Sequence, residues 1–206
     1  MLNVARNRGI QFEEHIGNIL NFLRHENINV LHECKDGIKD IHRAFGPISG
    51  IDHILIIDDC MIFIQDKWIS STISSNHISQ FTTAIRSVLH SSNTKPSKII
   101  LIYNSQTDLS KPSMNIMDQF KSEFNSINKV ISSTSRSAVY RRMTIILTKL
   151  LVKRQRTYNT FLYNSLCYLL SNNFICTNGE LLNDLYYDQI YVYDHEGCTE
   201  MICTID

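Results

Sequence analysis

The pattern of hydrophobic positions predicts a β-hairpin in the first third of the chain. Two apolar runs, residues 51–57 and 61–68, are rich in Ile and Phe and flank a short acidic turn. Runs of this length and composition are typical of strands, and a loop of two or three residues joins antiparallel neighbours. If residues 58–59 form the loop, Asp52 lies opposite Gln65. Apolar residues occur on both faces of the second run, which indicates a central strand covered on both sides.

Three polar side chains share one face at the open end of this hairpin. Directly opposed residues lie on the same face, which places Asp52 beside Gln65, and Lys67 follows two positions beyond Gln65. Polar groups on covered strands cost free energy unless they are paired or functional. An Asp52–Lys67 ion pair would be a structural explanation, and a cation site with a lysine beside it would be a functional one. Asp66 points to the opposite face by strand alternation, so only its backbone is available to this site.

The remaining pattern predicts an α/β fold. Apolar residues at three- and four-residue spacing indicate helices, and short apolar runs indicate strands. The expected helices are residues 9–24, 77–90, 114–124 and a long region 138–170 broken near 156–159; the further strands are 28–34, 98–103, 129–133, 189–193 and 201–204. The core order is αβββαβ, with a mixed central sheet flanked by helices and a parallel crossover after the hairpin. Polar residues 35–49 and serine-rich residues 70–76 are expected to be loops.

Length and composition predict how the chain divides into domains and where in the cell the protein is found. With 206 residues and 43% hydrophobic residues, we expect residues 1–135 to form the core and residues 136–206 to form a helical and acidic extension packed on it. The N-terminus shows no apolar segment of a signal peptide, and no apolar run has the length of a membrane span. The six cysteines are scattered without a CxxC pair. These features predict a protein inside the cell, in cytoplasm or nucleus, neither secreted nor bound to a membrane.

The formal net charge is zero, but the charges are unevenly distributed. After residue 156 the chain carries only acidic charged residues. Before it stands a basic segment that contains no acid and could bind a phosphate backbone, although a solvated helix face explains it equally well. Its seven basic residues are Arg136, Arg141, Arg142, Lys149, Lys153, Arg154 and Arg156.

The order of the motifs resembles the PD-(D/E)xK nuclease superfamily, in particular its Mrr-type restriction-endonuclease branch. Residues 9–20 (GIQFEEHIGNIL) are similar to the opening helix of that family, and Glu13 is the glutamate of its "FE". Residues 50–52 (GID) are similar to its metal-binding aspartate motif, and residues 64–68 (IQDKW) to the QxK motif of the branch. The resemblance covers roughly residues 9–103 and implies a restriction-endonuclease-like fold.

The resemblance implies a DNA endonuclease that depends on Mg²⁺ or Mn²⁺. Branched or modified DNA is a possible substrate, and a homodimer is a possible assembly. Asp52 and Gln65 would bind the cation with the Asp66 carbonyl, and Lys67 would position the attacking water. Glu13 would reach the site through a water or a second cation. Gln65 replaces the commoner glutamate and removes one negative charge, which would weaken cation binding.

An alternative function stays open, and so does the role of three residues that lie near the candidate site in the sequence. A nuclease-like fold without catalysis, serving as a nucleic-acid-binding or structural module, fits the zero net charge and Gln65. No Walker A, GxGxxG, HExxH or GxSxG sequence supports another enzyme class. His42, His53 and Gln80 lie near the site in sequence, and we expect them to be structural or solvated residues.

Overall fold

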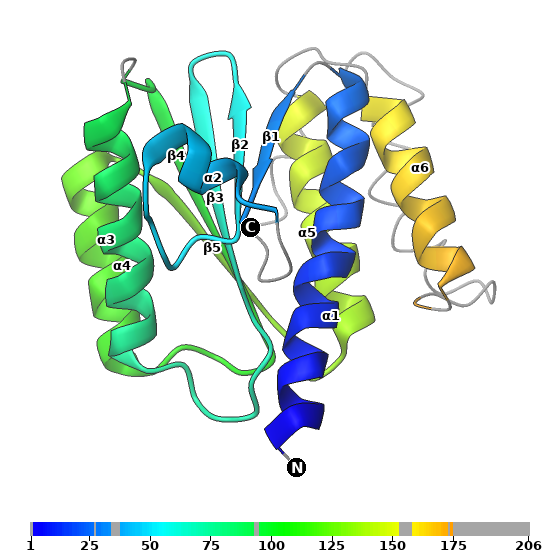
Figure 1. Cartoon of the computed structure of the whole chain (residues 1–206), viewed down its shortest axis with the longest axis horizontal. Helices are drawn as coiled ribbons and strands as arrows, with labels where there is room; N and C mark the ends of the chain where they lie inside the picture. Colours follow the sequence, from blue (N-terminus) through cyan, green and yellow to red (C-terminus); the bar gives the residue numbers. More distant parts are fainter. Residues whose placement is uncertain are drawn as a thin grey trace. The chain divides into compact units, whose positions relative to one another are not determined.

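The computed structural model describes residues 2–26, 28–33, 38–92, 95–152, 158–172 and 174 of the 206-residue chain. A five-stranded sheet in the first 139 residues has the order β1-β2-β3-β4-β5 (Figure 1). Its strands are β1 (Asn29–His32), β2 (His53–Ile57), β3 (Cys60–Lys67), β4 (Lys98–Ser105) and β5 (Ile127–Ser132). The first three strands pair antiparallel, whereas β3, β4 and β5 pair parallel. The predicted α/β fold with a mixed sheet flanked by helices is confirmed, and it is consistent with a restriction-endonuclease-like core.

The β2–β3 hairpin has the predicted register, because Ile57 pairs with Cys60 across a two-residue turn. Continued to the open end, this register sets Asp52 opposite Gln65. In the turn, Asp58 has a φ of 53°, a left-handed conformation that Asp and Asn tolerate better than most residues. The acidic turn therefore suits the tight connection that fixes which side chains share a face.

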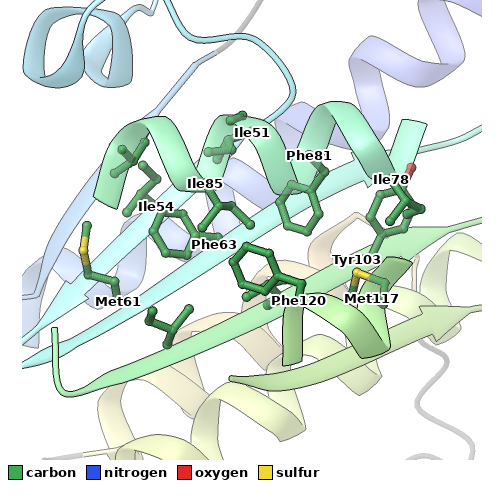
Figure 2. Close-up of a cluster of buried hydrophobic side chains, with 14 of the residues drawn as sticks. Ile51, Ile54, Met61, Phe63, Ile78, Phe81, Ile85, Tyr103, Met117 and Phe120 are labelled. Carbon is green, nitrogen blue, oxygen red and sulfur yellow. The ribbon is translucent and has the colours of Figure 1, made fainter. Parts of the chain in front are cut away.

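One hydrophobic core lies between one face of the sheet and two helices, α3 (Ser75–Ser91) and α4 (Lys111–Phe124). Phe63 of β3, Phe81 of α3 and Phe120 of α4 are completely buried in this cluster (Figure 2). Apolar residues of α3 recur at three- and four-residue spacing, which gives the helix one face for the sheet. We call this side of the sheet the α3 face.

The other face of the sheet packs against the first helix, α1 (Leu2–Asn21), which continues into the 3-10 turn η1 (Phe22–Glu26). Gly17 of α1 faces His53 of β2, and α1 lies across the sheet from α3 and α4 (Figure 1). Phe12, Ile16 and Leu20 form the buried stripe of this helix. We call this side of the sheet the α1 face.

The chain divides into two compact units, residues 1–139 and residues 140–206. Helix α5 (Arg136–Val152) begins in the first unit, and α6 (Tyr158–Ser171) belongs to the second. Within the second unit the rings of Tyr140 and Phe174 meet edge to face, with centroids 4.9 Å apart. The predicted extension from residue 136 and its packing on the core stay predictions. Within the described ranges, no helix has both the length and the apolar character needed to cross a membrane.

Several element boundaries differ from the prediction. Helix α2 (Asp40–Phe45) lies in the predicted loop 35–49, because six residues with one buried side chain, Ile41, produce no helical periodicity. Helix α1 begins seven residues before the predicted start at Gly9, at Leu2. The predicted strands at 189–193 and 201–204 lie outside the described residues.

Candidate functional site

Asp52 and Gln65 meet at the open end of the hairpin on the α3 face. The Asp52 backbone is held on both sides, because its N–H donates to the Ile64 carbonyl at 3.0 Å and its carbonyl accepts from the Glu33 N–H at 2.9 Å. Asp52 Oδ2 accepts hydrogen bonds from Gln65 Nε2 at 2.5 Å and from the Asp66 N–H at 2.7 Å. The hairpin therefore fixes this carboxylate directly against the Gln65 amide.

Two buried oxygens beside this pair have no hydrogen-bond partner in the described part of the chain. One is Oε1 of Gln65, a residue that is 9% exposed, and the other is the hydroxyl of Tyr103. Tyr103 pairs with Gln65 across β3 and β4 and shares its face. Burial, assisted by the nearby charges of Asp52 and Asp66, raises the pKa of Tyr103 above its usual range. Buried oxygens left unpaired in a native fold generally indicate a partner such as an ion, a water or a ligand.

Lys67 lies two residues beyond Gln65 on the same face and is half-buried. Its charge reaches the start of α3, where burial and Lys67 together lower the pKa of His77. The structural alternative, an Asp52–Lys67 ion pair, is not among the ion pairs of the described residues. The carboxylate is instead held by an amide and a backbone N–H.

An aromatic and cationic stack follows directly after Lys67. The Trp68 ring lies 4.7 Å from the Phe12 ring of α1, measured between centroids. The guanidinium carbon of Arg136 lies 5.5 Å from the Trp68 centroid, within the range of a cation–π interaction. Burial and the charge of Arg136 also lower the pKa of His15. Arg136 therefore brings a positive charge to the strand end that carries Lys67.

A second polar cluster lies on the α1 face, directly behind the first. His53 Nε2 is 2.9 Å from Asp66 Oδ2, and His53 Nδ1 is 2.8 Å from His32 Nδ1. Asn104 Nδ2 donates to Asp66 Oδ1 at 2.8 Å, and His32 Nε2 is 3.0 Å from Asn21 Oδ1. These five residues form a continuous chain that is buried except at half-buried Asn21, and we call it the histidine array.

One distribution of protons satisfies every contact of the histidine array. Asp66 donates its proton to His53 Nε2, His53 Nδ1–H donates to His32 Nδ1, and His32 Nε2–H donates to Asn21 Oδ1. Burial raises the pKa of Asp66 and, as the largest cause, lowers the pKa of both histidines to about 3. Both effects favour uncharged groups. These directions favour a neutral hydrogen bond between His53 and Asp66 over an ion pair.

Asp66 connects the two clusters through a single residue. Its side chain is held on the α1 face by His53 and Asn104, while its backbone N–H holds the Asp52 carboxylate. This arrangement confirms the predicted direction of the Asp66 side chain. The hydrogen bonds that hold the Asp66 side chain therefore also help to fix the position of the Asp52 carboxylate.

The oxygens at Asp52 and Gln65 are of the kind that Mg²⁺ prefers, namely a carboxylate, an amide oxygen and a backbone carbonyl, supplemented by water. The unpartnered Gln65 Oε1 fits such an ion, because a cation would satisfy this buried acceptor. Across the described ranges, no three His, Cys, Asp or Glu side chains gather as a metal-binding group. Binding of a cation here stays a prediction.

The other predicted site residues are Glu13 and the seven residues of the basic segment. Glu13 of α1 is half-buried and lies one helical turn before Gly17, so it approaches the strands from the α1 face. Of the predicted basic segment, Arg136 belongs to the first unit, whereas Arg141, Arg142 and Lys149 belong to the second. The remaining three, Lys153, Arg154 and Arg156, lie outside the described residues. Their roles stay predictions.

Sequence reasoning missed the histidine array and Tyr103. His53 was expected to be a structural or a solvated residue, and its specific partners were not foreseen. A signal was present, because a carboxyl group on the far face of a buried strand needs a hydrogen-bond partner, and His53 lies diagonally opposite Asp66 in the hairpin register. His32 could be added only once the β1–β2 register was known, which pairs it with His53.

No protein-family model matches the chain, and no similar protein was found among curated sequences or solved structures. The resemblance to PD-(D/E)xK nucleases therefore rests on the residues of the chain and on the confirmed fold class.

Proposed function

We propose that this protein is a metal-dependent endonuclease that hydrolyses DNA phosphodiester bonds, with branched or modified DNA among its candidate substrates. The observation that carries the proposal is the contact of the Asp52 carboxylate with the Gln65 amide at 2.5 Å, beside a buried Gln65 oxygen that lacks a partner among the described residues. Lys67 on the same strand face supports it, because a lysine two residues beyond the second ligand is what the QxK motif requires.

Hydrolysis of a phosphodiester needs an activated water and stabilisation of the negative charge that develops on phosphate. Bound Mg²⁺ or Mn²⁺ would supply both, held by the Asp52 carboxylate, the Gln65 oxygen and the Asp66 carbonyl. The Lys67 ammonium group donates hydrogen bonds to the attacking water and to a non-bridging phosphate oxygen. Glu13 would reach the site through a water or a second cation, and Arg136 beside Trp68 would bind a neighbouring phosphate.

One observation favours a second candidate function, a nuclease-like fold that binds nucleic acid or serves as a structural module without catalysis. The Asp52 carboxylate already accepts two hydrogen bonds, from the Gln65 amide and from the Asp66 N–H. These donors neutralise part of its charge without a cation, and Gln65 lacks the second negative charge of a glutamate. Cation affinity would then be too weak for catalysis.

Cleavage assays separate the two candidates. Supercoiled plasmid, linear duplex, four-way-junction DNA and an RNA duplex are incubated with Mg²⁺ or Mn²⁺, with EDTA as the metal-free control. We expect Asp52→Ala and Lys67→Ala to lose about a thousandfold in rate or more, because each removes charge stabilisation at the reacting phosphate. The exposed residues Asp118 and Lys111 of α4 supply the matched controls Asp118→Ala and Lys111→Ala, which should cleave as the wild type does.

The proposal fails if folded wild-type protein cleaves none of these substrates with either cation, or if both site variants retain full activity. Retained DNA binding without cleavage would favour the binding module. Trp68 is the single tryptophan of the chain, so its fluorescence reports binding of cation or DNA beside Lys67 without a label.

A further inference from the structure

A groove of about 500 Å³ lies between α3 and the segment that connects α2 to β2. Phe45 at the end of α2 and Ile48 of the connecting segment contribute apolar surface, and Ser49 contributes a hydroxyl. From α3, Gln80, Thr83 and Ser87 contribute an amide and two hydroxyls. The volume is within the range of small-molecule sites, and the groove has a half-buried aromatic ring on one side and polar groups on the other.

The lining of the groove restricts the chemistry of its ligand. None of the side chains that line it is charged, so it lacks the groups that select a phosphate or a metal ion. An aromatic ring beside amide and hydroxyl groups suits a flat ligand with hydrogen-bonding edges, because one face can stack while the edges are bound. Proteins recognise unpaired nucleobases by this combination.

The position of the groove connects it to the candidate site. Ser49 lies three residues before Asp52, so their Cα atoms are at most about 10 Å apart. Between them, Gly50 has a φ of 103°, and a Cβ at this position would lie 3.2 Å from the Gln80 backbone. Only glycine fits this approach without strain, and it keeps the connecting segment against α3. One wall of the groove, at Ser49, therefore lies within about 10 Å of Asp52.

We propose that this groove binds the base of one unpaired nucleotide next to the phosphate at Asp52 and Gln65. The inference rests on the proposed nuclease function and assigns its substrate class, namely DNA with an extrahelical or single-stranded nucleotide beside the cleaved bond. A base that is already unpaired enters at little cost, whereas a base in a matched duplex must first be unstacked. The groove thus selects disturbed DNA over a regular duplex.

The test measures binding without relying on cleavage. A short fluorescein-labelled duplex and the same duplex with one extra unpaired adenosine are titrated with protein in EDTA and again in Ca²⁺, and fluorescence anisotropy gives the two affinities. We expect wild-type protein to bind the bulged duplex about tenfold more tightly, since stacking of one base on an aromatic ring contributes on this scale.

Two variants change the groove in different ways. Thr83→Phe fills it from the exposed surface of α3, and Phe45→Leu keeps an apolar side chain but removes the ring. Both should bind bulged and matched duplexes equally. Gln119→Phe, which places the same bulk in a second hollow on α4, should retain the preference. Circular dichroism identifies folded variants, and either groove variant alone is a sufficient test.

Each outcome bears on the groove separately from the nuclease. Equal affinity of wild-type protein for both duplexes, or a bulge preference that survives both groove variants, overturns the inference even if the protein cleaves DNA. A preference lost in the groove variants of a protein that cleaves no substrate supports the groove and refutes the nuclease proposal. Absence of binding to either duplex overturns the inference as well.

Discussion

The two faces of the β2–β3 hairpin end carry polar clusters that differ in one respect. On the α1 face, the histidine array is closed at its centre, because both ring nitrogens of His53 and both carboxyl oxygens of Asp66 have hydrogen-bond partners. On the α3 face, the cluster is incomplete, because Gln65 Oε1 and the Tyr103 hydroxyl are buried without partners among the described residues. The faces alternate residue by residue along the same two strands.

This difference separates a structural role from a functional one. A buried polar group that is fully hydrogen-bonded is compatible with a stable core, and its network fixes the arrangement of the strands. A buried acceptor without a partner costs free energy, and such a cost is tolerated where a ligand completes the site. The histidine array, which we call the closed cluster, thus supports the open cluster of Asp52, Gln65, Lys67 and Tyr103 on the α3 face. Asp66 belongs to both, because its side chain lies in the array and its backbone N–H donates to Asp52.

Breaking the closed cluster should have the largest effect on stability. His53→Leu keeps the approximate volume but removes the partners of Asp66 Oδ2 and His32 Nδ1. We expect the free energy of unfolding to fall by about 3 kcal/mol, because two buried polar groups lose their hydrogen bonds. Urea denaturation followed by circular dichroism measures this change.

His90→Leu is the matched control, because His90 lies on the exposed surface of α3. Its effect should be within about 0.5 kcal/mol of zero. Lys67→Met should also leave stability nearly unchanged while it abolishes cleavage, since Lys67 belongs to the open cluster. A His53→Leu variant as stable as His90→Leu would show that the array does not hold the strands.

The fold could be predicted from sequence because its signals are local. The turn at residues 58–59 fixes a register, and the register determines which side chains share a face, so the Asp52–Gln65 contact was within reach of a sequence argument. The apolar run of β3 likewise predicted a strand covered on both faces. Helix α2 was missed because six residues carry too little periodicity.

The histidine array and the groove depend on contacts between segments distant in sequence. His32 meets His53 only through the pairing of β1 with β2, and Asn104 reaches Asp66 only through the parallel pairing of β3 with β4. Side-chain hydrogen bonds across three strands leave no spacing in a single sequence. The groove beside Gly50 could not be predicted from the sequence either, because it forms where a loop lies against a helix that is distant in sequence.

Completing the open cluster with a charge should strengthen cation binding. Gln65→Glu adds a carboxylate beside Asp52, and we expect it to bind Mn²⁺ about tenfold more tightly than wild-type protein, because ligand charge sets affinity at such sites. Without a cation the two adjacent carboxylates repel each other, so the metal-free variant should be less stable. Isothermal titration calorimetry measures the affinity.

Gln119→Glu on the exposed surface of α4 is the control for the added charge, and its Mn²⁺ affinity should equal that of wild-type protein. If Gln65→Glu loses stability without any gain in Mn²⁺ affinity, the Asp52–Gln65 pair is a structural contact. The two polar clusters would then differ in how many of their buried atoms have hydrogen-bond partners, but both would be structural.

The closed cluster also predicts a smaller effect, a stability maximum near neutral pH. His32 and His53 have their pKa lowered to about 3 from an ordinary 6.5, so their contribution is complete above pH 6.5 and is lost as the pH falls toward 3. Asp66 has its pKa raised from 3.8 to about 8, so its contribution is lost as the pH rises toward 8. Arg24 lowers and Asp40 raises the pKa of His32, and these two influences oppose each other.

Replacing the one acid of the array should remove only the alkaline side of this maximum. Asp66→Asn stays uncharged at every pH, and its amide can donate to His53 as the protonated carboxyl does. Between pH 6.5 and 8 we expect wild-type protein to lose on the order of 1 kcal/mol of unfolding free energy per pH unit, and the variant to lose almost none. Urea denaturation at both pH values, with Asp118→Asn as a surface control, measures the difference. Equal behaviour of variant and wild type would mean that Asp66 is ionised throughout this range, and the array would then contain an ion pair rather than a chain of neutral hydrogen bonds.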